Sequence, residues 1–339
     1  MEIRKATNAD IIQVMQFIND HWKVGHILSE SMLFMDWQHK SNKGYDFIIA
    51  VEKEAILAIL GYIDNLKYEA SSKNRIIWLA LWKVRDDVRN SGLGLKLVRF
   101  LQDIEKPDLL GVNGTKKDHH PIYQMLGFEV FSLSCFFIIN EFIPSKILGL
   151  DISRKVSNRP IVEHSLTLMN SSSLAEMDWS YQDTVNESIK TPSYFDARYL
   201  KHPVYNYCVY TIVGDSHRTT LISTRIVSHE GSKVLRVVDY SGDLKAIQNM
   251  AYGLTNLMIA ENIEYVDFWQ YGIDRDFLIQ AGFKDLDSEP GLLIPNFYEP
   301  FVYENGSIHS TLKCQVQHNY VVCKGDGDQD RPSKILDKL

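Results

Sequence analysis

Apolar and polar positions follow strand and helix spacing along residues 1–140. Apolar runs predict strands over Asp46–Glu52, Ala55–Asp64 and Arg75–Val84, with the first two joined as a hairpin. Leucine and valine at helical spacing predict a helix over Gly92–Glu105, and a short helix is expected to stop at Gly127. This alternation of strands and helices predicts an α/β fold.

A second pattern of the same kind follows a weakly patterned region, residues 146–173, whose Asn170-Ser171-Ser172-Ser173 run indicates a connection. Beyond it, a helix is predicted over Leu174–Ile189, a long helix over Leu244–Glu261 and a strand over Tyr265–Trp269. Both halves run strand, long helix, short strand, short helix and Gly-Phe. We therefore predict an internal duplication with domains at 1–145 and 174–339, and generic α/β alternation is the alternative.

Composition narrows the function classes. The 339 residues suit two domains, and the net charge of −7 argues against a general nucleic-acid-binding protein, which needs a basic surplus. No run of about 18 apolar residues exists, so no membrane insertion is expected, and the first residues do not resemble a secretory signal. The four cysteines lack Cys-x-x-Cys spacing, so we expect no metal site, no disulfide framework and a cytoplasmic protein.

One glycine-containing segment, Arg89-Asn90-Ser91-Gly92-Leu93-Gly94, lies between a predicted strand and a predicted helix. Glycine lets the backbone approach a ligand closely, and the unpaired N–H groups at a helix start attract a pyrophosphate. The segment is not a Rossmann fingerprint, because the third glycine is missing, nor a Walker loop, because no Gly-Lys-Ser/Thr follows. On its own it fits an anion site or a tight strand-to-helix turn.

The segment matches the R-x-x-G-x-G signature of the GNAT acyl-CoA transferase superfamily. Downstream, Ile122-Tyr123-Gln124-Met125-Leu126-Gly127-Phe128 resembles the L-Y-x-x-x-G-F segment of that superfamily. The resemblance covers roughly residues 1–140. It implies acyl-CoA as co-substrate and, with the duplication, two GNAT-like domains, each a mixed, mostly antiparallel twisted sheet flanked by helices.

The resemblance also implies roles for single residues. A main-chain N–H near Val84 or Trp82 would polarise the thioester carbonyl, and Tyr123 would protonate the leaving thiolate. The alternative for Tyr123 is a packed core tyrosine. The residues expected to hold coenzyme A are Trp82, Lys83, Val84, Arg89, Asn90, Ser91, Gly92, Leu93, Gly94, Leu95 and Asn113.

The general base is left open among several polar residues. The candidates are His26, Asp36, His119 and His120, and a water chain to a carboxylate is another route. Solvated imidazoles in a loop are the alternative for the two adjacent histidines.

Aromatic residues mark the expected acceptor side. Flat side chains beside polar groups suit a sugar or a nucleobase, although plain packing is the alternative. The residues expected to bind the acceptor are Trp22, Trp37, Arg198, Tyr199, Trp269 and Tyr271.

The second half lacks the glycine signature and has only Ser241-Gly242-Asp243 after its strand, so it is not expected to bind coenzyme A. Instead it would wall the acceptor site. The acidic segment Lys324–Pro332 is expected to be a turn-rich loop whose carboxylates hold arginines or sugar hydroxyls.

Most of the chain resembles nucleotide-sugar N-acyltransferases of bacterial surface-polysaccharide (lipopolysaccharide O-antigen) pathways. The nearest type transfers a hydroxybutanoyl group to dTDP-3-amino-3,6-dideoxygalactose. The resemblance implies an acyl-CoA donor and a dTDP-linked amino sugar as acceptor, and leaves a homodimer open. The alternatives are an acetyltransferase for a protein or small-molecule amine, a Fem-type aminoacyl transferase and a non-catalytic acyl-CoA sensor.

Overall fold

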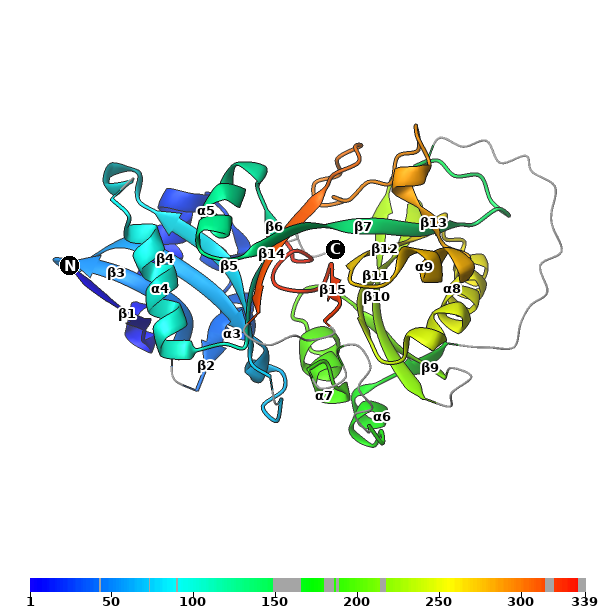
Figure 1. Ribbon diagram of the computed structural model, residues 1–339, viewed down its shortest axis with the longest axis horizontal. Coiled ribbons are helices and arrows are strands. Elements are labelled where there is room, and N and C mark those ends of the chain that lie inside the picture. The colour runs from blue at the N-terminus through cyan, green and yellow to red at the C-terminus, as the bar shows by residue number, and fades with distance from the viewer. Residues whose placement is uncertain are drawn as a thin grey trace.

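The computed structural model describes residues 1–42, 44–72, 74–89, 91–148, 166–179, 186, 189–213, 218–314 and 320–334. Two α/β halves lie side by side, and the long strand β7 (Glu129–Ile139) runs through both of them (Figure 1). The described strands join into one continuous sheet across the molecule.

The N-terminal half is built on a mixed sheet. Its own strands are β1 (Glu2–Ala6), β2 (Lys40–Ser41), β3 (Gly44–Glu52), β4 (Ala55–Asp64), β5 (Ile76–Val84) and β6 (Leu109–Thr115). Strands β1, β3, β4 and β5 pair antiparallel in that order, whereas β6 pairs parallel to β5. The predicted hairpin and the third predicted strand are therefore confirmed, with slightly shifted ends.

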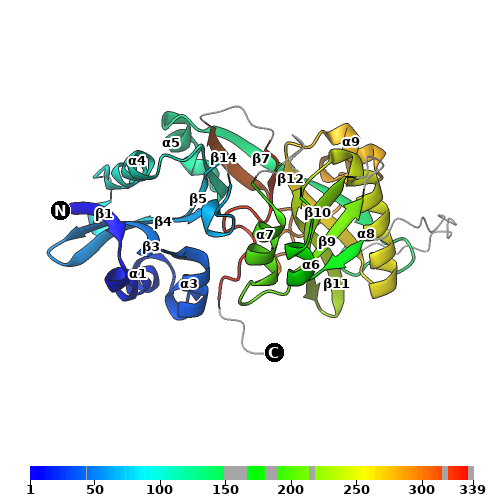
Figure 2. The ribbon, with the colours of Figure 1, turned by 90° about the horizontal axis from the view of Figure 1, so that it is seen from below.

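Helices cover both faces of this sheet (Figure 2). They are α1 (Ile11–Phe17), α2 (Ile27–Glu30), α3 (Met32–His39), α4 (Leu93–Glu105) and α5 (His120–Met125). The first three pack in one apolar cluster with β3 and β4, and α4 packs in another with Leu110 and Tyr123. The two clusters lie on opposite faces because side chains alternate along each strand.

The C-terminal half repeats the arrangement. Its strands are β8 (Thr167–Met169), β9 (Cys208–Val213), β10 (Thr219–His229), β11 (Ser232–Ser241), β12 (Tyr265–Tyr271), β13 (Lys284–Asp285), β14 (Ile308–Cys314) and β15 (Val322–Cys323). Its helices are α6 (Ser171–Ala175), α7 (Pro192–Phe195), α8 (Ile247–Glu261) and α9 (Arg275–Gln280). Strand β12 is parallel to β11, as β6 is to β5.

The strand order confirms the predicted duplication. The N-terminal half reads β1-β3-β4-β5-β6-β14-β7, and the C-terminal half reads β8-β9-β10-β11-β12-β7, with β13 on the far side of β7. Each half thus receives one inner strand from the other. The end of β7 enters between β12 and β13, and β14 enters between β6 and β7.

This exchange of strands bears on the predicted domain division. The division at 1–145, 146–173 and 174–339 stays a prediction, and β14 contributes residues 308–314 to the N-terminal sheet.

The helix predicted over Leu174–Ile189 is wrong where the structure describes it, because α6 ends at Ala175. Met177 and Trp179 both pack on the core, and a two-residue spacing faces one side only in an extended chain.

Candidate active site

Strands β5 and β6 start as neighbours and then diverge. Their pairing ends at Trp78 and Gly111, although β5 continues to Val84 against β4. Between these points β5 contains one residue more than β4. Gly61 pairs with Leu81 and Tyr62 pairs with Leu79, so Ala80 has no partner on β4. A bulge of this kind bends a strand and sharpens its twist. The result is an open edge between β5 and β6.

Two main-chain N–H groups face this open edge. The N–H of Arg85 donates to the carbonyl oxygen of Leu57 on β4, at 2.9 Å. Because N–H directions alternate along an antiparallel strand, the N–H groups of Val84 and Trp82 point away from β4. The pairing of β5 with β6 on that side ends at Trp78, so among the described strands neither N–H has a ladder partner. They are available to a thioester carbonyl.

The glycine segment leads into α4 and leaves its first turn open. Gly92 caps α4 at φ +72°, and a Cβ built on it would meet nothing within 4 Å. The N–H groups of Gly94 and Leu95 find no acceptor among the described residues. Unpaired N–H groups with the positive end of a helix dipole form an anion site.

Other residues predicted to bind coenzyme A lie near this turn, in different environments. Arg89 is exposed, and Lys83 forms an ion pair with Asp86 at 2.9 Å. Ser91 accepts from the N–H of Leu93 at 3.4 Å. Asn90 lies outside the described residues.

Tyr123 lies beside the open edge. Its ring centroid is 6.1 Å from that of Trp82 on β5 and 5.5 Å from that of Phe128. The side chain is 5% exposed, and burial raises the pKa of its hydroxyl to about 12. That hydroxyl forms no hydrogen bond within the part of the chain that the structure describes. A protonated phenol without a partner suits donation to a developing thiolate.

A histidine that the sequence analysis missed lies near α5. His309 of β14 places its ring 5.2 Å from that of His120, and its Nδ1 is 2.7 Å from Ser132 Oγ. The Nε2 atom of His120 is buried and unpartnered among the described residues. His119 is exposed. The motif around Tyr123 gave no sign of His309, because β14 comes from the other end of the chain.

The two other candidates for the general base, His26 and Asp36, already form polar contacts within the protein. His26 caps α2, with Nδ1 accepting from the N–H of Leu28 at 3.2 Å and Nε2 2.9 Å from Arg331. Its pKa falls to about 3, chiefly through burial and then through Arg331. Asp36 is hydrogen-bonded to the Tyr45 hydroxyl and paired with Lys40 at 2.8 Å.

The predicted acceptor residues do not form one pocket. Trp37 and Arg198 meet between the halves, with the guanidinium 5.2 Å from the ring centroid, and Arg198 also donates to the Tyr68 hydroxyl at 3.0 Å. The remaining four lie apart. Trp22 is exposed on the N-terminal half. Tyr199 donates to Asp239 at 2.6 Å, and Trp269 donates to Asp267 at 3.3 Å. Tyr271 stacks on Phe131, with 4.0 Å between the ring centroids.

The equivalent open edge of the C-terminal half is filled by the chain itself. Strands β11 and β12 stop pairing after Val237 and Phe268, and β15 then pairs with β12. The N–H of Gly325 donates to the Val238 oxygen of β11, and the N–H of Lys324 donates to the Trp269 oxygen of β12 at 3.2 Å. This peptide occupies the space that a pantetheine arm would need.

The turn before α8 is closed as well. Gly242, at φ +132°, lies against Thr220, so that a Cβ would meet Thr220 Oγ1 at 2.6 Å. The Asp243 carboxylate accepts from the N–H of Lys245 at 3.0 Å. An acid therefore already occupies the helix start, and the C-terminal half has no room for a pyrophosphate there.

From this edge the chain continues as the C-terminal loop, residues 326–333, across the N-terminal half. Asn113 Nδ2 donates to the oxygens of Cys323 and Asp326 at 3.0 and 2.9 Å, and its Oδ1 accepts from Ser310. The side chain predicted to hold coenzyme A thus anchors this loop. At the far end the N–H of Ile27 donates to the Ser333 oxygen at 3.2 Å.

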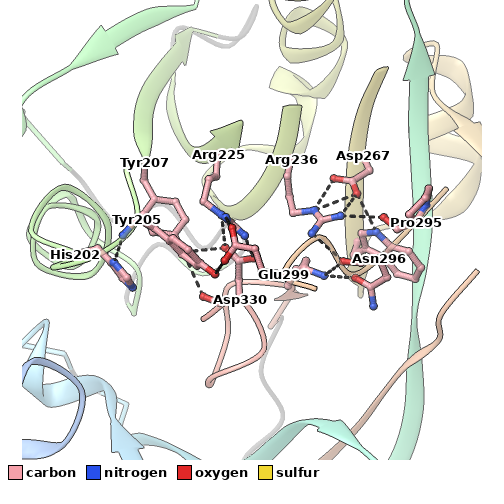
Figure 3. Close-up of polar contacts among 12 residues, drawn as sticks. His202, Tyr205, Tyr207, Arg225, Arg236, Asp267, Pro295, Asn296, Glu299 and Asp330 are labelled. Atoms are coloured by element: carbon pink, nitrogen blue, oxygen red, sulfur yellow. Dashed lines mark hydrogen bonds and ion pairs between the residues drawn. The ribbon is translucent and has the colours of Figure 1, made fainter. Parts of the chain in front are cut away.

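A buried ion pair fixes the base of the C-terminal loop (Figure 3). Arg225 Nη2 lies 2.9 Å from Asp330, which also accepts from Tyr207 at 2.8 Å. These arginine and hydrogen-bond contacts lower the pKa of Asp330 despite its burial. Arg331 pairs with Asp328 at 2.8 Å. The prediction that the acidic segment holds arginines is confirmed for these two pairs.

Potential metal ligands gather at one described place, Asp239, Cys323 and Asp326. The ammonium of Lys190 lies among them, 2.6 Å from Asp239 and 2.9 Å from Asp326. A cation is therefore already supplied by the chain. Among the described helices, none combines the length and apolar character needed to cross a bilayer.

The comparisons with known proteins agree with this architecture. No family model and no curated protein matches the sequence. A GCN5-related N-acetyltransferase from Anabaena variabilis has a TM-score of 0.53 and 12% identity, covering 92% of this chain and 72% of that one. Another, from Kribbella flavida, has a TM-score of 0.54 and 11% identity, covering 92% of this chain and 70% of that one. The chain has the fold of the GNAT N-acetyltransferases.

Proposed function

We propose that the protein transfers an acyl group from acyl-CoA to an amine. The observation that carries the proposal is the open edge between β5 and β6. It is flanked by the turn at Gly92, which no described residue fills, and by the Tyr123 hydroxyl, which has no partner among the described residues. The pyrophosphate would bind the N–H groups of Gly94 and Leu95. The pantetheine arm would then follow β5 as a further strand.

The reaction would proceed by direct attack. The amine nitrogen forms a bond to the thioester carbon, and the carbon–sulfur bond breaks. A main-chain N–H of Val84 or Trp82 would stabilise the oxyanion, and Tyr123 would give its proton to the thiolate. Before it attacks, the acceptor's ammonium group loses its proton to a base, for which His120 has a ring nitrogen with no partner in the described part of the chain.

The acceptor class is a nucleotide-linked amino sugar, with dTDP as the nucleotide and hydroxybutanoyl or acetyl as the acyl group. The resemblance to surface-polysaccharide N-acyltransferases supports this choice. The second half supports an elaborate acceptor, because its C-terminal loop covers the face of the N-terminal sheet opposite α5.

A panel experiment tests the proposal. The protein is incubated with several acyl-CoA donors and either dTDP-3-amino-3,6-dideoxygalactose, a lysine peptide or an aminoglycoside, and free thiol and product mass are followed. We expect thiol release and an acylated amino sugar. Product with the peptide alone would move the function to protein acetylation. No thiol release with any donor would contradict acyl transfer.

A further inference from the structure

One side chain of the C-terminal loop, Gln329, reaches strand β6 at Gly114. Strand β6 carries a bulge at Gly114, because His309 pairs with Thr115 while Ser310 pairs with Asn113. Gly114 has φ +89°, and a Cβ built on it would lie 1.9 Å from Gln329 Oε1. The carboxamide therefore lies directly over the backbone of Gly114, beyond the point where β6 leaves β5.

This side chain stands on the opposite face of the sheet from Tyr123. Asn113 holds the loop on the face that carries Trp78, and Gly327 packs against Asn113 and Trp78. Tyr123 belongs to the apolar cluster of α4 on the other face. A thioester lying in the open edge would thus have the thiolate acid on one side and Gln329 on the other.

The loop is held rigidly while the Gln329 amide itself is unused. Asp330 is buried against Arg225, and Asp328 is paired with Arg331, which reaches His26. Gln329 is half-buried, and its carboxamide has no hydrogen bond to any described residue. Because no internal hydrogen bond has to be broken, the donor and acceptor of this carboxamide are free to exchange water for a ligand.

We propose that Gln329 positions the acceptor, by hydrogen bonds from its carboxamide to a hydroxyl-bearing substrate. A carboxamide offers both a donor and an acceptor, as sugar hydroxyls require, but cannot take a proton from an ammonium at neutral pH. Gln329 is therefore a positioning residue and not the base. The inference rests on the proposed function and adds a residue from the far end of the chain to its site.

Calorimetric titration of the CoA-bound protein with dTDP-3-amino-3,6-dideoxygalactose tests the inference. We expect Gln329→Ala to weaken binding about tenfold, the loss of about one to two hydrogen bonds. The same variant should raise the KM for the amino sugar and leave the Kd for CoA unchanged. Gln280→Ala, on exposed α9, is the matched control and should bind normally.

The outcomes separate the two claims. Equal binding of the sugar by the wild type and by Gln329→Ala would overturn the inference, with the proposed function intact. A loss of CoA binding in Gln329→Ala would also overturn it, because the effect would then be structural. A wild type that releases thiol but does not bind the sugar overturns the positioning role for this acceptor. The absence of thiol release refutes the proposed function instead.

Discussion

Replacing Gly92 by aspartate places a carboxylate where the pyrophosphate is expected. Gly92 has φ +72°, so any side chain there incurs the cost of a left-handed backbone, about 1 kcal/mol. Aspartate and asparagine tolerate this conformation better than other residues. Nothing lies within 4 Å of the added Cβ, so the fold accommodates the side chain.

The expected loss of affinity follows from charge repulsion. At about 5 Å and an effective dielectric constant of about 20, two unit charges repel by about 3 kcal/mol. The Kd for coenzyme A should therefore rise about 10²-fold, and the effect should shrink at high salt. Isothermal titration at low and high salt measures both quantities.

Two controls isolate the charge from the backbone. Gly92→Asn has nearly the same shape without the charge and should weaken binding much less than Gly92→Asp. Gly231 also lies at positive φ, +81°, with nothing within 4 Å of its Cβ, but in the turn between β10 and β11. Gly231→Asp should lower stability by about the same 1 kcal/mol and leave coenzyme A binding unchanged. Wild-type affinity in Gly92→Asp would refute the pyrophosphate assignment.

Three further outcomes are expected. Tyr123→Phe should lower kcat about 10²-fold with unchanged Kd for CoA, and an unchanged kcat in steady-state assays would exclude the acid role. Gly325→Ala would place a Cβ 2.4 Å from the Tyr199 hydroxyl, so urea unfolding should show a loss of about 1–3 kcal/mol with normal CoA binding. Buried His39 donates from Nδ1 to the Tyr62 oxygen, and burial lowers its pKa from 6.5 to about 3. It stays neutral while the unfolded chain takes a proton, so its contribution to stability falls below pH 6.5 by about 1.4 kcal/mol per pH unit. A His39→Gln variant should lose this part of the pH dependence in urea unfolding at pH 7 and pH 5.

The N-terminal elements and the glycine turn could be predicted because their signals are local. Gly92 and Tyr123 lie within short motifs that neighbouring strands and helices position. The strand β14 could not be placed in the same way. It pairs with β6, almost 200 residues earlier, and no local pattern in the sequence indicates that partner.

Two predicted site residues already have partners within the chain. His26 and Asn113 offer polar groups that could contact a ligand, and each forms hydrogen bonds with the C-terminal segment. His26 meets Arg331 across 305 positions of sequence, and Asn113 meets Asp326 across 213. A sequence pattern gives the donors and acceptors that a side chain offers. Only the fold decides whether a ligand or another part of the chain takes them.

The two halves of the duplication differ in whether the chain itself fills the open edge. Both keep the diverging parallel pair and the helix that follows its first strand, so both inherit an open edge. In the second half the peptide around Gly325 bonds to both strands, and Asp243 takes the helix start. In the first half both places are unfilled by the described chain, and the same C-terminal segment passes over the edge without entering it. One segment thus closes the second edge and packs beside the first, so that it links the two halves.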